Sequence, residues 1–162
     1  MIKTKVYITI LSVLIGLTLA FIWINSCLPP ETSGKESSTV YEGVVGAVTT
    51  VVGEQKAETF KTVFTEQVLR KLAHFSEFGL LGLELALLHL AIGKLAPKHF
   101  AFLGGYGVTV AIIDECIQIF SKRGASVIDV LIDLCGYVFI CAVTVAIIFL
   151  IKRRKDKKTL NG

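Results

Sequence analysis

Hydrophobic residues along this chain fall into four long blocks that polar segments separate. The blocks run over Val6–Ile24, Leu72–Ile92, Phe100–Phe120 and Val127–Ile151. An apolar block of about 18 residues or more predicts a membrane span, because about 20 residues of α-helix cross the hydrocarbon layer. The pattern therefore predicts an all-α integral membrane protein built as a four-transmembrane-helix bundle. Its spans are expected at about residues 6–28, 72–92, 100–120 and 126–151, in one domain over residues 1–151 that a basic tail follows at 152–162.

The segment between the first two blocks, residues 29–71, is predicted to be an outer loop. Its first part, Pro29–Ser38, is rich in Pro, Ser, Thr and Gly, which predicts irregular structure. Two later sets of apolar residues recur at helical spacing: Val40, Val44, Val48, Val51 and Val52, then Phe60, Val63, Phe64 and Val68. They predict an amphipathic helical segment that lies on the outer leaflet or covers the bundle.

Basic residues predict the orientation of the spans. If the N-terminus is cytoplasmic, the inner segments hold ten basic residues: Lys3, Lys5, Lys94, Lys98 and the six of Lys152–Lys158. The outer segments hold seven, and residues 29–71 offset their five basic residues with six glutamates. A basic cluster directly after a span favours the anionic inner leaflet. Both termini are therefore predicted to be cytoplasmic, and the net charge of +4 does not indicate a nucleic-acid partner.

The cysteines give no sign of a disulfide. They lie inside or at the edge of predicted spans without CxxC spacing, as Cys27, Cys116, Cys135 and Cys141. We interpret them as small apolar packing residues. The stretch Ile24–Cys27 loosely resembles a lipoprotein cleavage site, but Asn25 fits that motif poorly and the apolar run is long for a signal core. The first block is therefore interpreted as a span.

Charged side chains interrupt the second block. Arg70, His74 and Glu77 are spaced i, i+4 and i+7, so they share one face of a helix. Glu84 continues this face deeper into the span. Charges within spans are costly and usually face the interior of a bundle or a water-filled cavity, so this face is predicted to point inward.

The third and fourth blocks carry matching polar positions. In the third, Asp114 and Gln118 share a face, and Glu115 lies three residues before Gln118. In the fourth, one face is formed by Ser126, Asp129, Asp133 and Gly136. A glycine on this face would let a neighbouring helix approach closely. Both sets lie at the ends of the spans that are predicted to face outward.

Depth counting places the acids at one level. With a rise of about 1.5 Å per residue, Glu77, Asp114 and Asp133 lie roughly 8 to 10 Å below the outer edge. Above them lie Arg70, His74, Gln118, Arg123 and Asp129. The alternative interpretation is structural, with arginines that only neutralise the acids. Six acids within the spans are many for that purpose, so we predict a polar pocket that opens outward.

These polar residues also carry a resemblance to a known family. The motifs are RKLAHFSEF at 70–78 with Leu81-Gly82, DECIQIF at 114–120, KRG at 122–124, and Asp129 and Asp133 before Gly136. Together with Asn25-Ser26 and Pro29-Pro30 they resemble the VanZ-like family over nearly the whole chain except the basic tail. The family is associated with glycopeptide resistance, above all to teicoplanin and related lipoglycopeptides. The resemblance implies a multi-pass protein of a bacterial cell membrane, typically Gram-positive, with a role in the cell envelope, but no particular reaction.

Two functions are compatible with these residues. The first is the binding or modification of an envelope lipid or cell-wall precursor head group, in a pocket formed by Arg70, Lys71, His74, Glu77, Asp114, Glu115, Gln118, Arg123, Asp129 and Asp133. Arginine and lysine side chains there would contact phosphate or carboxylate groups. The oligomeric state is not predicted by any of these patterns.

The second function is an intramembrane enzyme that acts on a lipid head group. Asp129 and Asp133, with Asp114 or Glu115, would hold a divalent cation, since carboxylates suit such ions. The catalytic candidates are His74, Glu77, Asp114 and Asp133, with His74 as general acid or base. No GxSxG, HExxH or P-loop motif is present. A small transporter ranks last, because the polar positions stop near Glu84.

Overall fold

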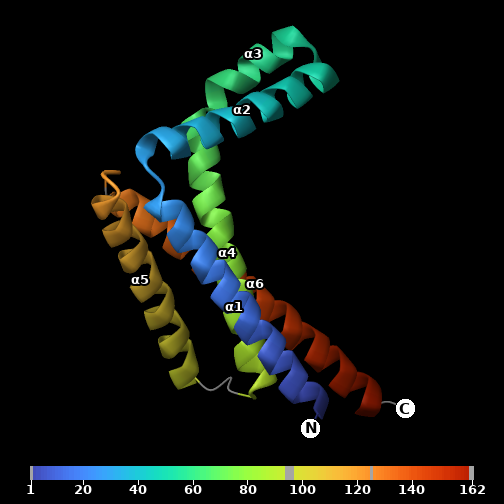
Figure 1. Cartoon of the computed structure of the whole chain (residues 1–162). Coiled ribbons are helices and arrows are strands. Elements are labelled where there is room, and N and C mark those ends of the chain that lie inside the picture. The colour runs from blue at the N-terminus through green and yellow to red at the C-terminus, as the bar shows by residue number, and fades with distance from the viewer. Residues whose placement is uncertain (1, 94–96, 125, 161–162) are drawn as a thin grey trace.

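The computed structural model describes residues 2–93, 97–124 and 126–160, and every regular element within them is a helix (Figure 1). The helices are α1 (Ile2–Cys27), α2 (Pro30–Val52), α3 (Glu54–Val63), α4 (Glu66–Ala91), α5 (Pro97–Phe120) and α6 (Val127–Leu160). The predicted all-α class is confirmed. Lys94 of the predicted inner segments lies outside the described residues, as do the side chains of Lys3, Lys98 and the tail from Lys155 onward.

Three of these helices are long and apolar enough to cross a membrane. The candidate spans are Thr4–Cys27 in α1, Ala101–Phe120 in α5 and Val127–Arg154 in α6. Helix α4 covers the remaining predicted span, but it is more polar because one of its faces carries His74, Glu77 and Glu84. The chain is therefore a helical membrane protein with three candidate spans in the described residues.

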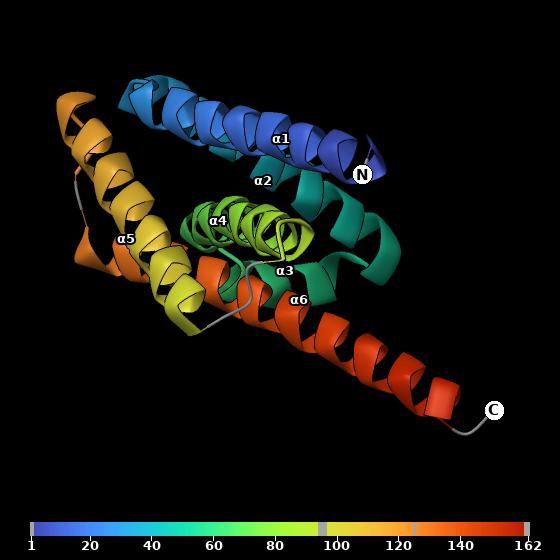
Figure 2. The same cartoon turned by 90° about the horizontal axis from the view of Figure 1, so that it is seen from below.

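Helix α4 lies at the centre of the bundle. It packs along α6 and against α1, and α5 contacts both α1 and α6. The start of α1 and the last turns of α6 lie at the same end of the bundle (Figures 1 and 2). The α2–α3 hairpin projects at the opposite end, which we call the hairpin end; there α1 and α5 end and α4 and α6 begin.

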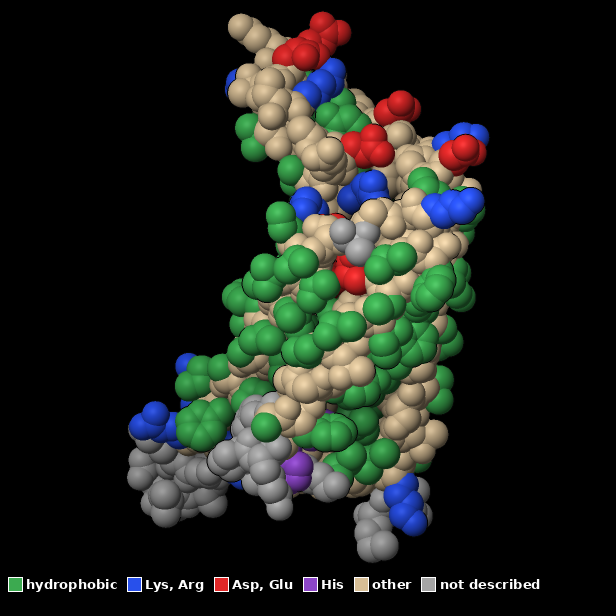
Figure 3. All heavy atoms as spheres, turned by 90° about the vertical axis from the view of Figure 1, so that its left-hand side faces the viewer, with side chains coloured by type: hydrophobic (Ala, Val, Ile, Leu, Met, Phe, Trp, Pro, Cys, Tyr) green, Lys and Arg blue, Asp and Glu red, His purple; other side chains and the backbone are tan. Residues whose placement is uncertain are grey.

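The surface is divided as a bilayer would require. Hydrophobic side chains cover the middle of the face in Figure 3, whereas charged side chains gather toward its two ends. The exposed hydrophobic residues of α1 include Val6, Ile10, Val13, Leu17, Phe21 and Ile24. Such an apolar band between charged ends is typical of a protein that spans the membrane.

Glycines bring α4 and α6 into close contact. A Cβ atom added to Gly136 would collide with the carbonyl oxygen of Phe75, and one added to Gly82 would collide with that of Tyr137. Small residues at a helix–helix interface let two backbones approach within a membrane. The prediction that Gly136 allows a close neighbour is therefore confirmed. This approach holds the polar faces of α4 and α6 against each other.

Tyr137 attaches α5 to this central pair. Its ring lies so close to α5 that a Cβ atom on Gly107 would be 2.6 Å from a ring carbon. Its buried hydroxyl donates a hydrogen bond of 2.9 Å to the carbonyl oxygen of Leu103. The contact links the middle of α6 to α5.

Replacing Tyr137 with phenylalanine should lower the free energy of unfolding by about 1 kcal/mol, because one buried hydrogen bond is lost while the ring stays. Denaturant unfolding of the detergent-solubilised protein measures the change. Tyr7→Phe is the matched control, since Tyr7 is 66% exposed. Equal unfolding curves for the two variants would show that the hydroxyl does not stabilise the attachment of α5.

The segment after α1 is more regular than the sequence predicts. The expectation of irregular structure over Pro29–Ser38 is wrong, because α2 begins at Pro30. Proline is tolerated at the first helical position, where its missing N–H would have had no partner within the helix. The helical spacing of the valines in this segment is confirmed by α2, although α2 has no buried residue.

The second predicted amphipathic stretch is divided between two helices. Helix α3 ends at Val63, and α4 begins at Glu66. The turn between them is fixed by Thr65, whose hydroxyl accepts a hydrogen bond of 3.3 Å from the backbone N–H of Val68. This N-cap restarts the helix in a new direction, so the hairpin leaves the bundle at this point. Contact of the hairpin with the outer leaflet stays a prediction.

Candidate functional site

The predicted site residues meet at the hairpin end of the bundle. They come from the first turns of α4 and α6, the last turns of α5, and the connection after α5. Because the three helices present these residues at similar distances from their ends, side chains that are far apart in sequence become neighbours. The structure thus forms the polar layer that depth counting predicts.

Asp114 is one of two fully buried acids in this layer. Its side chain is 0% exposed and accepts hydrogen bonds on both carboxylate oxygens. Ser26 Oγ of α1 donates to Oδ1 at 2.5 Å, and Gln118 Nε2 of the same helix donates to Oδ2 at 2.8 Å. Both donors are neutral, so they orient the carboxylate without neutralising its charge.

Asp133 lies beside Asp114 and is also 0% exposed. Its Oδ1 is 3.4 Å from Nδ1 of His74. Neither Asp133 oxygen has a hydrogen-bond partner among the described residues, and neither does His74 Nδ1. Ligand atoms of His74, Asp114 and Asp133 all lie within 4.8 Å of one another. The layer therefore contains a buried group with capacity to bind a cation.

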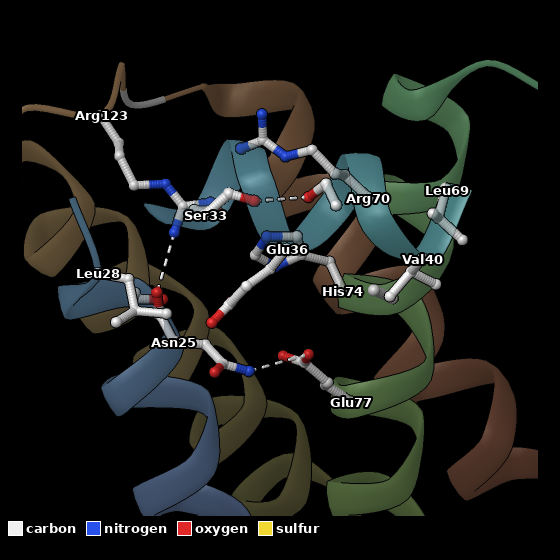
Figure 4. Close-up of a pocket in the computed structure, with 13 residues that line it drawn as sticks. Asn25, Leu28, Ser33, Glu36, Val40, Leu69, Arg70, His74, Glu77 and Arg123 are labelled. Carbon is white, nitrogen blue, oxygen red and sulfur yellow. Dashed lines mark hydrogen bonds between the residues drawn. The ribbon is translucent and has the colours of Figure 1, made fainter. Parts of the chain in front are cut away.

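Asn25 links three elements above this group. Its Nδ2 donates to Glu77 Oε1 at 3.4 Å, and its backbone oxygen accepts a bond of 3.0 Å from Arg123 Nη1 (Figure 4). These bonds join the end of α1 to α4 and to the connection after α5. Burial lowers the pKa of Arg123, and the like charge of Arg70 lowers it further.

Three further charged residues of the site, Lys71, Asp129 and Glu115, have structural partners. Lys71 Nζ and Asp129 Oδ1 form an ion pair of 3.0 Å between α4 and α6. Glu115 Oε2 accepts a hydrogen bond of 2.8 Å from the backbone N–H of Ser126, just before α6 begins. A carboxylate at this place stabilises the start of a helix. Asp129 and Glu115 therefore hold α4, α5 and α6 together.

Two cavities open above the buried group. The first, of about 270 Å³, lies between α1, α2 and α4, and the second, of about 290 Å³, lies between α4 and the connection from α5 to α6. Both are lined by Arg70, His74 and Arg123. The first is also lined by apolar side chains, namely Leu28, Val40, Leu69 and Ala73.

The sequence patterns predicted most residues of this layer, but they did not indicate Asn25 and Ser26 as members. Ser26 and Asn25 lie at the end of an apolar span, and only the family resemblance drew attention to them. Their contacts with Asp114 and Glu77 join positions 88 and 52 residues apart, which no local pattern indicates. Glu84 does not join the layer: it is buried deeper, where Thr18 Oγ1 of α1 donates to it at 3.0 Å.

The fold and site define a helical membrane protein with a buried acidic layer and two cavities at one end. A family model described as VanZ/LLP1 matches residues 8–151, so the chain belongs to this family. The resemblance described from the motifs is thereby confirmed, and it makes the chain a membrane protein of a family linked to glycopeptide resistance. Neither curated proteins nor solved structures gave a match.

Proposed function

We propose that the cavities bind the anionic head group of an envelope lipid or of a lipid-linked cell-wall precursor. The observation that supports this most directly is the position of Arg70 and Arg123, which line both cavities. Arg70 is exposed and forms no hydrogen bond or ion pair with another described residue. Arginine binds phosphate and carboxylate through two parallel N–H donors, so a free guanidinium beside a cavity suits an anion.

Electrostatics favours the same ligand. Arg123 Nε is buried without a hydrogen-bond partner among the described residues. Burial lowers the pKa of Arg123, and repulsion by the charge of Arg70 lowers it further. An anion between the two guanidinium groups would relieve this repulsion and accept the unused N–H. The cavity therefore binds an anion more favourably than a neutral head group.

The lining of the first cavity suits an amphiphile. Its lining combines polar side chains, including Asn25, Ser37 and Glu77, with the apolar side chains of Leu28 and Val40. A lipid can bring its head group to the polar side chains while its first methylene groups contact the apolar ones. A small hydrophilic anion would leave the apolar side chains unused.

The proposed topology directs the cavities toward the outside of the cell. Helix α4 would also cross the membrane, since its 26 residues extend about 39 Å. With the three candidate spans of the described residues this makes four spans. Four spans place both termini on one side, and the basic residues that follow Ile151 favour the cytoplasmic side. The hairpin end would then face outward, where the last steps of cell-wall assembly use lipid-linked precursors.

A polyprenyl diphosphate in phosphatidylcholine nanodiscs tests the proposal. Native mass spectrometry should show binding to the full chain, and little binding of a polyprenol of the same chain length. The double substitution Arg70→Gln with Arg123→Gln should weaken binding at least about 100-fold, since each charged hydrogen bond contributes about 1.5–3 kcal/mol.

Lys122→Gln is the control for each single substitution, because it removes one positive charge from an exposed position that is next to Arg123 and lines neither cavity. It should leave the affinity nearly unchanged. If the polyprenol binds as tightly as the diphosphate, or if the control weakens binding as much as the double variant, the cavities do not recognise an anionic head group.

A further inference from the structure

We infer that His74, Asp114 and Asp133 form a binding site for a divalent transition-metal ion, with Zn²⁺ as the best fit. The three side chains come from α4, α5 and α6. Their ligand atoms lie within 4.8 Å of one another at the hairpin end of the bundle. The site lies below the cavities and does not depend on what the cavities bind.

The geometry is close to that of a bound ion. In a tetrahedral zinc site with bonds of 2.0–2.1 Å, neighbouring ligand atoms are about 3.3 Å apart. His74 Nδ1 and Asp133 Oδ1 already have a separation of 3.4 Å. At this distance the two atoms are too far apart for a good hydrogen bond, but correctly spaced to share a metal. The Asp114 ligand atom lies within 4.8 Å of both, so it has to approach them by no more than about 1.5 Å to reach the spacing of a zinc site.

The buried carboxylates favour a bound cation. Asp114 and Asp133 are both 0% exposed, and Asp133 uses neither oxygen in a hydrogen bond with a described residue. An ionised carboxylate in a membrane interior is costly unless it is paired. A protonated His74 could compensate one of the two negative charges at most. A divalent ion compensates both and uses the free lone pairs of Asp133.

Neighbouring side chains already orient one of the ligands. Ser26 and Gln118 donate to the two oxygens of Asp114, which leaves one lone pair on each oxygen for an ion. Ligating carboxylates in metal sites are typically held by such hydrogen bonds. Ser26 and His74 line the first cavity, and His74 and Gln118 line the second. An open coordination position would therefore face the cavities.

The ligand set differs from the one that the sequence predicts. The i, i+4 spacing indicated Asp129 with Asp133, together with Asp114 or Glu115. In the structure Asp129 forms its ion pair with Lys71, and Glu115 binds the start of α6. His74 takes their place, because the close approach at Gly136 brings α4 against α6.

The donor atoms decide between metals. Mg²⁺ and Ca²⁺ prefer six or more oxygen ligands, many of them carboxylates or waters. Imidazole nitrogen suits zinc and its neighbours in the first transition row, and zinc accepts carboxylate oxygens as well. One nitrogen and two carboxylates with an open position resemble zinc sites that hold three protein ligands.

The test uses the full chain, purified in detergent without a histidine tag and stripped with a chelator. Zinc is added, unbound metal is removed, and the bound metal is measured by mass spectrometry. We expect one equivalent of zinc per chain, and a Co²⁺ spectrum in the visible range that indicates tetrahedral coordination. Cys27 and Cys116 are exposed thiols, so the measurements on the wild-type chain are repeated with all four cysteines replaced by alanine.

Substitutions then locate the site. Asp133→Asn and His74→Gln should weaken zinc binding at least about 100-fold, since loss of even an outer hydrogen-bond partner costs 10- to 100-fold. Ser26→Ala, which removes such a partner of Asp114, should weaken it by about 10- to 100-fold. Thr18→Ala is the matched control, because Thr18 is also on α1 and donates to a different buried acid, Glu84.

The outcomes are decisive even if a ligand variant misfolds, which gel filtration reveals. A wild-type chain that retains no zinc or cobalt overturns the inference without any variant. So does zinc that stays bound in folded Asp133→Asn, or that disappears when only the cysteines are replaced. Equal effects of Ser26→Ala and Thr18→Ala would likewise contradict the orienting bond to Asp114.

Discussion

Replacing Gly136 with valine is expected to prevent stable packing of α4 against α6. Even a Cβ atom at this position would collide with the backbone carbonyl oxygen of Phe75. A backbone atom cannot rotate away as the end of a side chain can, so the two helices must separate. We expect a loss of more than about 4 kcal/mol, in the range of the most severe single substitutions. Denaturant unfolding and protease sensitivity in membranes measure this loss.

Gly105→Val is the control for the bulk of the side chain. Gly105 lies on α5, and a Cβ atom there would have no neighbour within 4 Å. Its replacement should leave unfolding nearly unchanged. If Gly136→Val were equally mild, α4 and α6 would not pack as closely as the structure shows, and the polar layer between them would lose its basis.

The close approach at Gly136 also shows what sequence periodicity can predict. A helix repeats every 3.6 residues and rises about 1.5 Å per residue, so shared faces and equal depths follow from residue numbers alone. This regularity is why Asp114 and Asp133 were expected at one level and are found within 4.8 Å of His74. Counting within helices succeeds because the geometry of each helix is nearly fixed.

Partners between helices were harder to predict. Periodicity shows which face of α6 carries Asp129 and Asp133, but not that Lys71 pairs with the first and His74 with the second. That choice depends on how far α4 slides and rotates against α6, which the packing of glycines and Tyr137 determines. The donors Asn25 and Ser26 were missed as contacts for the same reason.

The outer segment shows a different limit. Pro29–Ser38 has the composition of a loop, yet most of it is helical within α2. Composition averages over positions, whereas proline disrupts a helix only beyond its first turn. Pro30 at the first position is compatible with the helix, and the serines that follow bond to carbonyl oxygens one turn earlier, as Ser37 does to Ser33 at 2.9 Å.

The second large effect is expected when His74 alone is replaced with leucine. Asp133 would then be buried without the imidazole that lies 3.4 Å from its carboxylate, and breaking a buried pair in this way typically costs about 3–5 kcal/mol. Whether Asp133 stays ionised or takes up a proton, the carboxyl group lacks the contact that its burial requires. Unfolding measured with chelator present, so that no metal contributes, reports this cost directly.

Adding Asp133→Leu to His74→Leu should restore most of the lost stability, because replacing a whole buried pair with apolar residues is often nearly neutral. His89→Leu is the control: His89 is a buried histidine of the same helix, but its ring nitrogen bonds to the carbonyl oxygen of Leu85 in its own helix. The double variant should fold and yet bind no zinc. A double variant as unstable as His74→Leu would show that the two residues act independently. A folded double variant that still binds zinc would place the ion elsewhere. The double variant therefore separates the two effects: it should regain stability but not zinc binding. Leucine side chains can fill the space of a buried polar pair, but they cannot coordinate a metal ion.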